Sequence, residues 1–216
     1  MRNQARYFSP AMIERRADQL LVDYARLHSL DGIPPIPIEK IVEDFLGLRI
    51  LWEPIPETSG VTVLAKLTPA ARRITLNETH VEFIMAKPFL YNTILAHETG
   101  HWDLDMERGT LLQRTTLTGF TAPEYILHGA DVVSAQQEKN AHRFMAYLLM
   151  PKRLLYEAVE QIPIHGFPDL YRLRDQFAVT VTTLQIRLEE LGLVYIDADG
   201  NFHESRQVFD GQLRLL

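Results

Sequence analysis

The sequence predicts an α+β fold, in which a three-stranded, mostly antiparallel sheet packs against helices and is followed by a helix-turn-helix-like segment with a wing. Three observations predict it. Two long stretches carry apolar residues at helical spacing, and short strand-like runs lie between them. The C-terminal part combines two short helical patterns with a hairpin signal. Strands grouped apart from helices favour an α+β arrangement.

Composition excludes several classes of protein. The chain has 216 residues, 46% of them apolar and 23% charged, which is ordinary for a globular protein. It has no cysteine, so disulfide frameworks, cysteine-based zinc sites and thiol nucleophiles are excluded. The net charge of −6 gives no general attraction to nucleic acid or anionic membranes. No apolar run approaches the roughly 20 residues of a membrane span. We expect a soluble cytoplasmic protein with no membrane partner.

The first part of the chain predicts two helices. Ser9 is suited to cap a helix over about 10–28, because Pro10 then occupies its first turn. The proline-rich segment 32–37 interrupts the helical pattern. A shorter helix is expected over about 37–46, with Gly47 as its C-terminal stop.

Three short runs rich in β-branched and aliphatic residues follow. The predicted strands are 48–52, 61–67 and 73–76. Proline, serine and glycine separate the first two runs, and a Thr-Pro-Ala segment separates the last two. We expect a small, mostly antiparallel sheet with helices on one face.

The central motif of the chain is a His-Glu-x-x-His sequence, His97-Glu98-Thr99-Gly100-His101, on a helix expected over about 88–104. Residues four apart share one helix face, so His97 and His101 can hold one zinc ion between them. Glu98 lies about 100° round the axis, beside the metal, where it can accept a proton from a water that the metal activates. This pattern is typical of zinc hydrolases.

Catalytic zinc needs a third protein ligand, and Glu138 is the leading candidate. The segment 138–150 is helical in pattern, and Glu138 lies at the head of its apolar stripe. A carboxylate on the core face of a helix is costly unless it is paired or bound to a metal. The alternative is a solvated glutamate that the helix dipole favours at a helix start.

Other candidate ligands are weaker. Glu107 and His128 lie in a long stretch, 103–135, whose glycines, acidic residues and proline predict irregular structure. His142 follows Glu138 by one turn and is a candidate for a hydrogen bond to a ligand, or an ordinary surface histidine.

The two motifs together resemble the ImmA/IrrE family of bacterial and phage metallopeptidases. The resemblance rests on Ala96-His97-Glu98-Thr99-Gly100-His101 paired with Glu138-x-x-Ala141-x-x-Phe144-x-x-x-Leu148-Leu149-Met150-Pro151. It covers about residues 12–193, including Pro34-Pro35-Ile36-Pro37 and Arg187-Leu188-x-x-Leu191-Gly192-Leu193. It implies His97, His101 and Glu138 as metal ligands and Glu98 as the catalytic acid/base. Thr99 stands where the family often has an apolar residue, and Met145 where alanine is common.

The C-terminal segment predicts a small winged helix. Helices are expected over 170–177 and 181–191, with Val179-Thr180 as turn and N-cap and Gly192 as the stop. Strand-like residues flank Asp199-Gly200, a hairpin signal. We therefore divide the chain into a zincin-like metallopeptidase domain, 1–165, and a helix-turn-helix-like module with a C-terminal hairpin, 166–216.

The module has few cations for DNA. Its candidate recognition helix offers Thr182, Thr183, Gln185 and Arg187 but ends in Glu189-Glu190. Residues 170–216 hold five arginines and seven acidic residues, a net charge of −2. Because phosphate contacts dominate DNA affinity, we favour a packing or partner-recognition role over direct DNA binding.

These observations together lead us to expect a zinc-dependent metalloendopeptidase, although manganese or another divalent ion also suits a His-His-Glu site. The oxyanion stabiliser stays open among Tyr147, Tyr156 and His142. The family resemblance implies that the substrate is a helix-turn-helix transcriptional repressor, cleaved to derepress stress or mobile-element genes. The alternatives are a DNA- or partner-binding regulator with a structural metal, and a toxin-like component of a paired operon.

Overall fold

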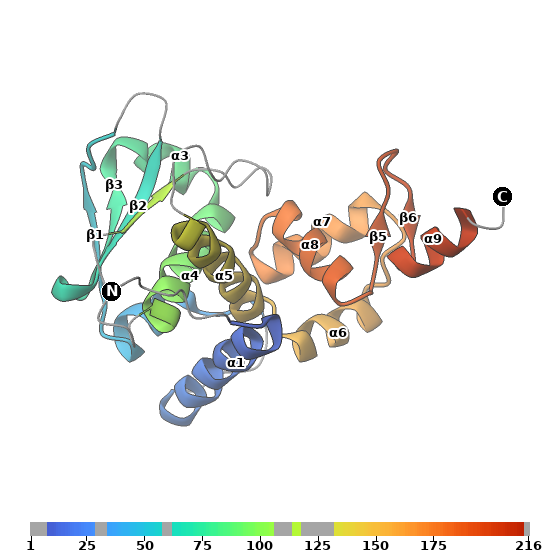
Figure 1. Ribbon diagram of the computed structural model, residues 1–216, viewed down its shortest axis with the longest axis horizontal. Coiled ribbons are helices and arrows are strands. Elements are labelled where there is room, and N and C mark those ends of the chain that lie inside the picture. Colours follow the sequence, from blue (N-terminus) through green and yellow to red (C-terminus); the bar gives the residue numbers. More distant parts are fainter. Residues whose placement is uncertain (1–7, 29–33, 58–61, 106–113, 118–131, 214–216) are drawn as a thin grey trace.

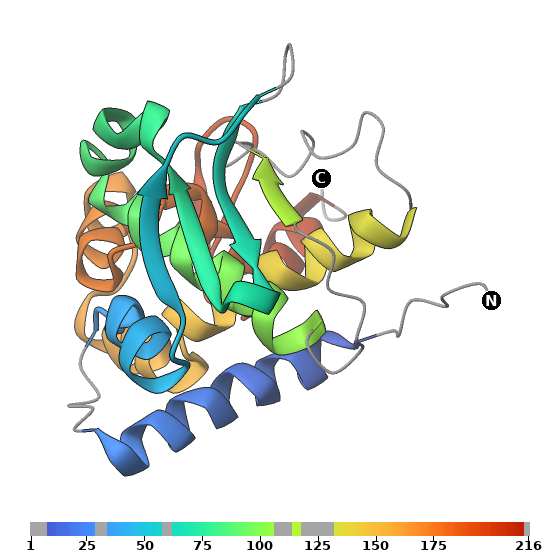
Figure 2. The same cartoon turned by 90° about the vertical axis from the view of Figure 1, so that its left-hand side faces the viewer.

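Helix α4 (Pro88–Asp105) lies between a β-sheet and helix α5 (Val132–Leu149), and helix α1 (Pro10–Leu27) packs along α5 (Figures 1 and 2). The computed structural model describes residues 8–28, 34–57, 62–105, 114–117 and 132–213. The α+β fold class that the sequence predicts is confirmed.

The sheet contains the three predicted strands and a further one. Its strands follow the spatial order β1-β3-β2-β4. Their bounds are β1 (Arg49–Glu53), β2 (Val63–Thr68), β3 (Arg73–Asn77) and β4 (Arg114–Leu117). β2 pairs antiparallel with both β3 and β4, whereas β1 runs parallel to β3. The sheet is therefore mostly antiparallel, as expected.

The stretch 103–135, expected to be irregular, contains the end of α4, the strand β4 and the start of α5. β4 completes the sheet by pairing with β2, and its two threonines suit an extended strand. Helix α5 begins at Val132, so the predicted start at residue 138 was six residues too late. The candidate ligands Glu107 and His128 lie outside the described residues.

Helix α4 is buried on all sides along its motif. Every residue from Thr93 to Trp102 is buried. A helix that is enclosed all round lies in the interior, and here the sheet covers one side and α5 another. A second, smaller core cluster fills the space between the sheet and the start of α4. Within the described ranges, no helix has both the length and the apolar character that crossing a bilayer requires.

The N-terminal helices begin and end close to the predicted residues. The Ser9 side chain accepts a hydrogen bond from the backbone N–H of Met12, so it caps α1. The helix expected over 37–46 is present as α2 (Ile38–Lys40) continued by the π-helix η1 (Ile41–Phe45). Gly47 ends it with φ +61°, a conformation that favours glycine. The remaining short helices are η2 (Pro69–Ala71), η3 (Glu78–His80) and α3 (Val81–Met85).

The C-terminal part contains a helix-turn-helix followed by a hairpin, as predicted. Its elements are α6 (Lys152–Gln161), α7 (Phe167–Phe177), α8 (Val181–Glu190), β5 (Tyr195–Ile196), β6 (Phe202–His203) and an unpredicted α9 (Arg206–Leu213). The Thr180 side chain accepts from the N–H of Thr183 and caps α8. The main buried cluster runs without a break from α1 through α5 to α7 and α8. The two-domain division at 165/166 stays a prediction.

Candidate metal centre

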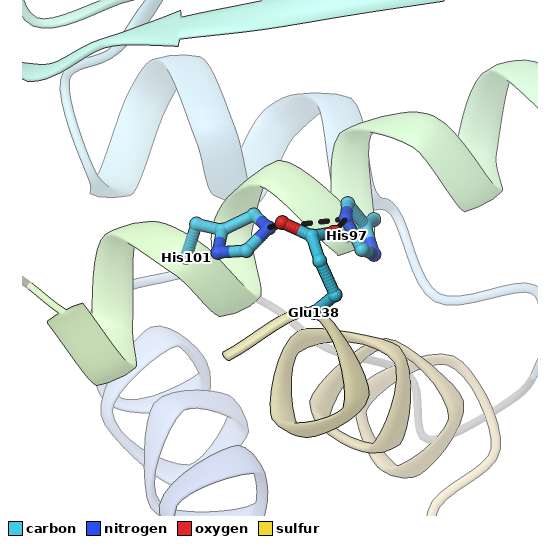
Figure 3. A group of neighbouring side chains, drawn as sticks. All are labelled: His97, His101 and Glu138. Atoms are coloured by element: carbon cyan, nitrogen blue, oxygen red, sulfur yellow. Dashed lines mark hydrogen bonds and ion pairs between the residues drawn. The ribbon is translucent and has the colours of Figure 1, made fainter. Parts of the chain in front are cut away.

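His97 and His101 lie one turn apart on α4 and both face α5 (Figure 3). Their Nε2 atoms are 3.1 Å apart, and the ring planes meet at 84°. Both imidazoles are almost completely shielded from solvent, at 0% and 1% exposure. The two histidines therefore share one face of the helix, as the motif spacing predicts.

Glu138 reaches the same point from α5. Its Oε2 lies 3.2 Å from Nε2 of His97, and its Oε1 lies 3.2 Å from Nε2 of His101 (Figure 3). Glu138 does not stand at a helix start, because α5 begins six residues earlier. Its side chain is only 22% exposed and is engaged with both histidines, so it is not the solvated glutamate of the alternative interpretation.

The close approach of α4 and α5 occurs at Gly100. A Cβ added there would lie 3.0 Å from both the Cα and the carbonyl oxygen of Ala141, and 3.2 Å from the Cβ of Phe144. His97 precedes Gly100 by about one turn, and Glu138 precedes Ala141 by one turn. The small residues at the crossing therefore bring the ligand atoms together. The motif alone does not reveal this role of Gly100, although small residues on facing helices are a signal that a sequence can show.

The three ligand atoms fit a small tetrahedral cation. One ligand atom from each residue lies within 4.8 Å of the others. The two Nε2 atoms are 3.1 Å apart, and each lies 3.2 Å from a different oxygen of the Glu138 carboxylate. Ligands about 2.0–2.2 Å from a tetrahedral zinc ion are separated by roughly 3.3–3.5 Å. Two imidazole nitrogens and one carboxylate are also a donor set of catalytic zinc sites, which keep the fourth position open.

The electrostatics of the site favour an ionised carboxylate. Desolvation alone would raise the pKa of Glu138, but its hydrogen bonds with His101 and His97 outweigh that effect and hold the pKa well below its usual value. Metal ligands must be deprotonated, so this environment keeps Glu138 in the form that binds a cation.

Glu98 follows His97 on α4 and is fully buried. Burying a carboxylate costs free energy, and buried ionisable groups of this kind cluster at functional sites. Its position on the helix, about 100° from His97, places it beside the ligands rather than among them.

Of the three candidate oxyanion stabilisers, the structure brings one to the site. The ring centroid of His142 lies 4.5 Å from that of His97. Burial, followed by the charge of His97, lowers the pKa of His142 to about 3, so its imidazole is neutral at physiological pH. The hydroxyl of Tyr147 instead donates to Glu190, and that of Tyr156 donates to the carbonyl oxygen of Leu191 at 3.4 Å. Both tyrosines are therefore directed to α8.

The C-terminal turn of α4 is tied to α1. The guanidinium of Arg16 donates from Nε to the carboxylate of Asp103 at 2.6 Å and from Nη2 to the Asp103 carbonyl at 2.9 Å. Asp103 follows His101 by two residues, so this contact helps to hold the end of the helix that carries the ligands.

Arg187, counted from sequence among the residues of the recognition helix, faces the interior. It is 1% exposed, and its guanidinium lies 4.2 Å from the ring centroid of Tyr147. It forms ion pairs with Glu14 on α1 and, at 3.3 Å, with Glu190. It joins α8 to α1 and α5 and is not available to a phosphate.

Comparison with known proteins supports the fold. No family model matches the chain, and no curated protein does. Among solved structures, the chain is similar to a Mycobacterium tuberculosis transcriptional regulator, with a TM-score of 0.52 and 14% identity over 88% of the present chain. The chain spans 53% of that protein's length. At this level of identity the similarity concerns the fold alone.

Proposed function

We propose that this chain is a metal-dependent endopeptidase of the ImmA/IrrE type, with a divalent cation, in first place zinc, held by His97, His101 and Glu138. The observation that supports it most is that two buried histidine nitrogens on α4, 3.1 Å apart, each lie 3.2 Å from an oxygen of the Glu138 carboxylate on α5. Each of the three is a residue type that zinc accepts, and one coordination position is left for a reactant.

When bound, such a cation supplies Lewis-acid chemistry: it polarises a carbonyl and makes a nucleophile available from water at neutral pH. In this proposal, residues of the chain carry out the proton transfer and stabilise the oxyanion. Glu98 takes the proton of the attacking water and passes it to the leaving amine. His142, neutral and in contact with His97, is the candidate donor to the developing oxyanion.

The proposed substrate is a helix-turn-helix transcriptional repressor, cleaved to release the genes it silences. The fold similarity to a transcriptional regulator suits a place in gene control. The sequence resemblance supplies the peptidase activity, and the geometry of the site supports it.

The test uses the full chain, loaded with zinc, and helix-turn-helix repressors from the same genome. Mass analysis of the mixture should reveal two fragments whose masses add up to the repressor plus one water. The variant Glu98→Gln should bind zinc as tightly as the native chain and yield no fragments, because it keeps the ligands and loses the proton acceptor. Cleavage by this variant at the native rate would refute the role of Glu98, and an intact repressor with the loaded native chain would refute the activity.

A second candidate is a regulator in which the metal site serves structure. The fold similarity to a transcriptional regulator favours it. Salt-sensitive binding of a specific DNA duplex by the metal-loaded chain, without cleavage of any repressor, would favour this candidate over the peptidase.

A further inference from the structure

The two faces of the β-sheet differ in chemistry. The inner face joins the buried clusters beneath the sheet through a set of aliphatic residues: Ile50, Ala65, Leu67, Ile74 and Leu76. Because side chains alternate along a strand, the residues between them point to the outer face. Figure 2 shows this outer face turned toward the viewer, with α4 behind the sheet. We call five of its residues the outer patch: Arg49, Lys66, Thr68, Arg73 and Thr75.

The outer patch is contiguous across three strands. In the register of the sheet, Arg73 on β3 lies between Arg49 on β1 and Thr68 on β2. Thr75, two residues further along β3, lies beside Lys66 on β2. Neighbouring strands are roughly 4.8 Å apart, and alternate residues of one strand are roughly 7 Å apart. The five side chains therefore start close enough together to contact one small ligand.

Three polar atoms of the outer patch are buried and have no hydrogen-bond partner among the described residues. They are Oγ1 of Thr68, Oγ1 of Thr75 and Nε of Arg73. Thr75 as a whole is only 3% exposed. A buried donor or acceptor without a partner costs free energy, and nearly all such groups in native proteins have one, in the chain or in a bound water or ion. Three of them on adjoining strands indicate a position where a bound group supplies the missing partner.

The outer patch also carries unbalanced positive charge. Arg49 and Lys66 form no ion pair with any residue that the structure describes. The guanidinium of Arg73 lies 3.4 Å from the carboxylate of Glu53, a long contact to a side chain that is 46% exposed. Glu53 is the only acidic residue of β1, β2 and β3. Arg49 and Arg73 stand side by side, where like charges repel, so an anion between them would replace repulsion by attraction.

We propose that the outer patch binds a phosphate group, either as the free ion or carried by a small phosphorylated molecule. Arginine and lysine form charge-assisted hydrogen bonds to phosphate, and threonine hydroxyls also bond to its oxygens. A tetrahedral dianion accepts hydrogen bonds from several directions, which suits donors that come from three strands. A planar carboxylate offers two oxygens and one charge.

This site is separate from the candidate metal centre. The candidate ligands face α5, whereas the sheet lies on the other side of α4 (Figure 1). The two sites share no residue, so the proposal does not rest on the proposed function and stands or falls independently of it.

The test is calorimetric titration of inorganic phosphate into the metal-free chain, so that the ion cannot bind to zinc. The paired change Arg49→Gln and Lys66→Gln should weaken binding about ten-fold or more, because it removes two of the three positive charges. A second titration with glycerol phosphate distinguishes the sources. Tighter binding of the ester identifies a phosphorylated molecule as the ligand, and tighter binding of phosphate identifies the free ion; both results support the proposal.

Thr75→Val gives a second readout, because it keeps the shape of the side chain and removes only the hydroxyl. This change should weaken phosphate binding roughly five-fold through the lost hydrogen bond. The Tm of the chain without phosphate should not fall, since the hydroxyl has no hydrogen bond to lose. A lower Tm with unchanged phosphate affinity would overturn the assignment of this hydroxyl to the ligand.

The matched control removes two exposed cations elsewhere, by Arg15→Gln on α1 and Arg172→Gln on α7. It should change phosphate affinity less than about two-fold, since it alters only the net charge. Equal weakening by both pairs, no phosphate binding by the native chain, or acetate binding as tight as that of phosphate would each overturn the proposal. Binding of a mixed-sequence oligonucleotide without binding of phosphate would assign the outer patch to nucleic acid and would also overturn it.

Discussion

Gly100 on α4 and Ala141 on α5 are in contact without a side chain between them: a Cβ on Gly100 would come within 3.0 Å of the backbone of Ala141. This contact fixes the separation of the two helices that supply the candidate ligands. Because His97 and Glu138 each lie about one turn from it, a small change in the contact moves the carboxylate relative to the imidazoles.

Gly100→Ala should therefore weaken zinc binding while the fold persists. The added methyl must displace the Ala141 backbone by a few tenths of an ångström. Misplacing a group that supports metal ligands typically costs about ten-fold or more in affinity, measured by competition with a chromophoric chelator. Gly211→Ala on α9 is the control, because its Cβ would meet nothing within 4 Å. Equal zinc affinities of Gly100→Ala and Gly211→Ala would show that the contact between α4 and α5 does not position the metal ligands.

Zinc should stabilise the native chain, and Glu138→Gln should lose most of that stabilisation. A ligand present at about 100 times its Kd stabilises the folded state by about 2.7 kcal/mol, which appears as a rise in Tm on adding zinc and a fall on chelation. The amide keeps the size of the side chain but removes the charge. Glu160→Gln, an exposed change on α6, should respond to zinc as the native chain does. A rise in Tm of the same size in Glu138→Gln would place the cation elsewhere.

Arg187→Leu should destabilise the fold by about 3 kcal/mol, at the lower end of the cost of breaking a buried ion pair. The leucine leaves Glu14 and Glu190 without the guanidinium, although both carboxylates keep some contact with solvent, at 27% and 36% exposure. Urea denaturation of the metal-free chain measures the loss. Tyr147→Phe, which removes one hydroxyl from the same network, should cost only about 1 kcal/mol. Similar losses in the two variants would mean that the guanidinium charge contributes little.

The hairpin should weaken in acid. The hydrogen bond with His203, followed by bonds from Asn201, holds the pKa of Asp197 well below its usual value. A carboxyl whose pKa is lower in the folded state stabilises the fold above its unfolded pKa of 3.8, and this contribution is lost as the pH falls through the folded value. The Tm difference between the native chain and Asp197→Asn should be constant near neutral pH and narrow below about pH 3.8. If the Tm difference between the two chains instead increased as the pH fell, folding would raise the pKa of Asp197 and not lower it.

The sequence predicted the parts of this molecule that have a local signal. The motif spacing located His97 and His101, and the cost of a carboxylate on an apolar stripe identified Glu138. Caps and glycine stops placed most helix ends within a few residues. β4 was missed because its strand form depends on β2, a partner distant in sequence. The burial of Arg187 had a readable signal, since it shares a helix face with Leu184 and Leu188, but its charge suggested the surface.

The buried guanidinium of Arg187 also limits how the polypeptide can be shortened. A fragment ending at residue 165 would remove α7 and α8 from the shared core and leave Glu14 without its ion-pair partner. Apolar area now covered by α7 and α8 would face water, which favours aggregation of the shortened fragment. Trimming for crystallisation, domain swapping with a relative, or fusion to a tag should therefore preserve everything through α8.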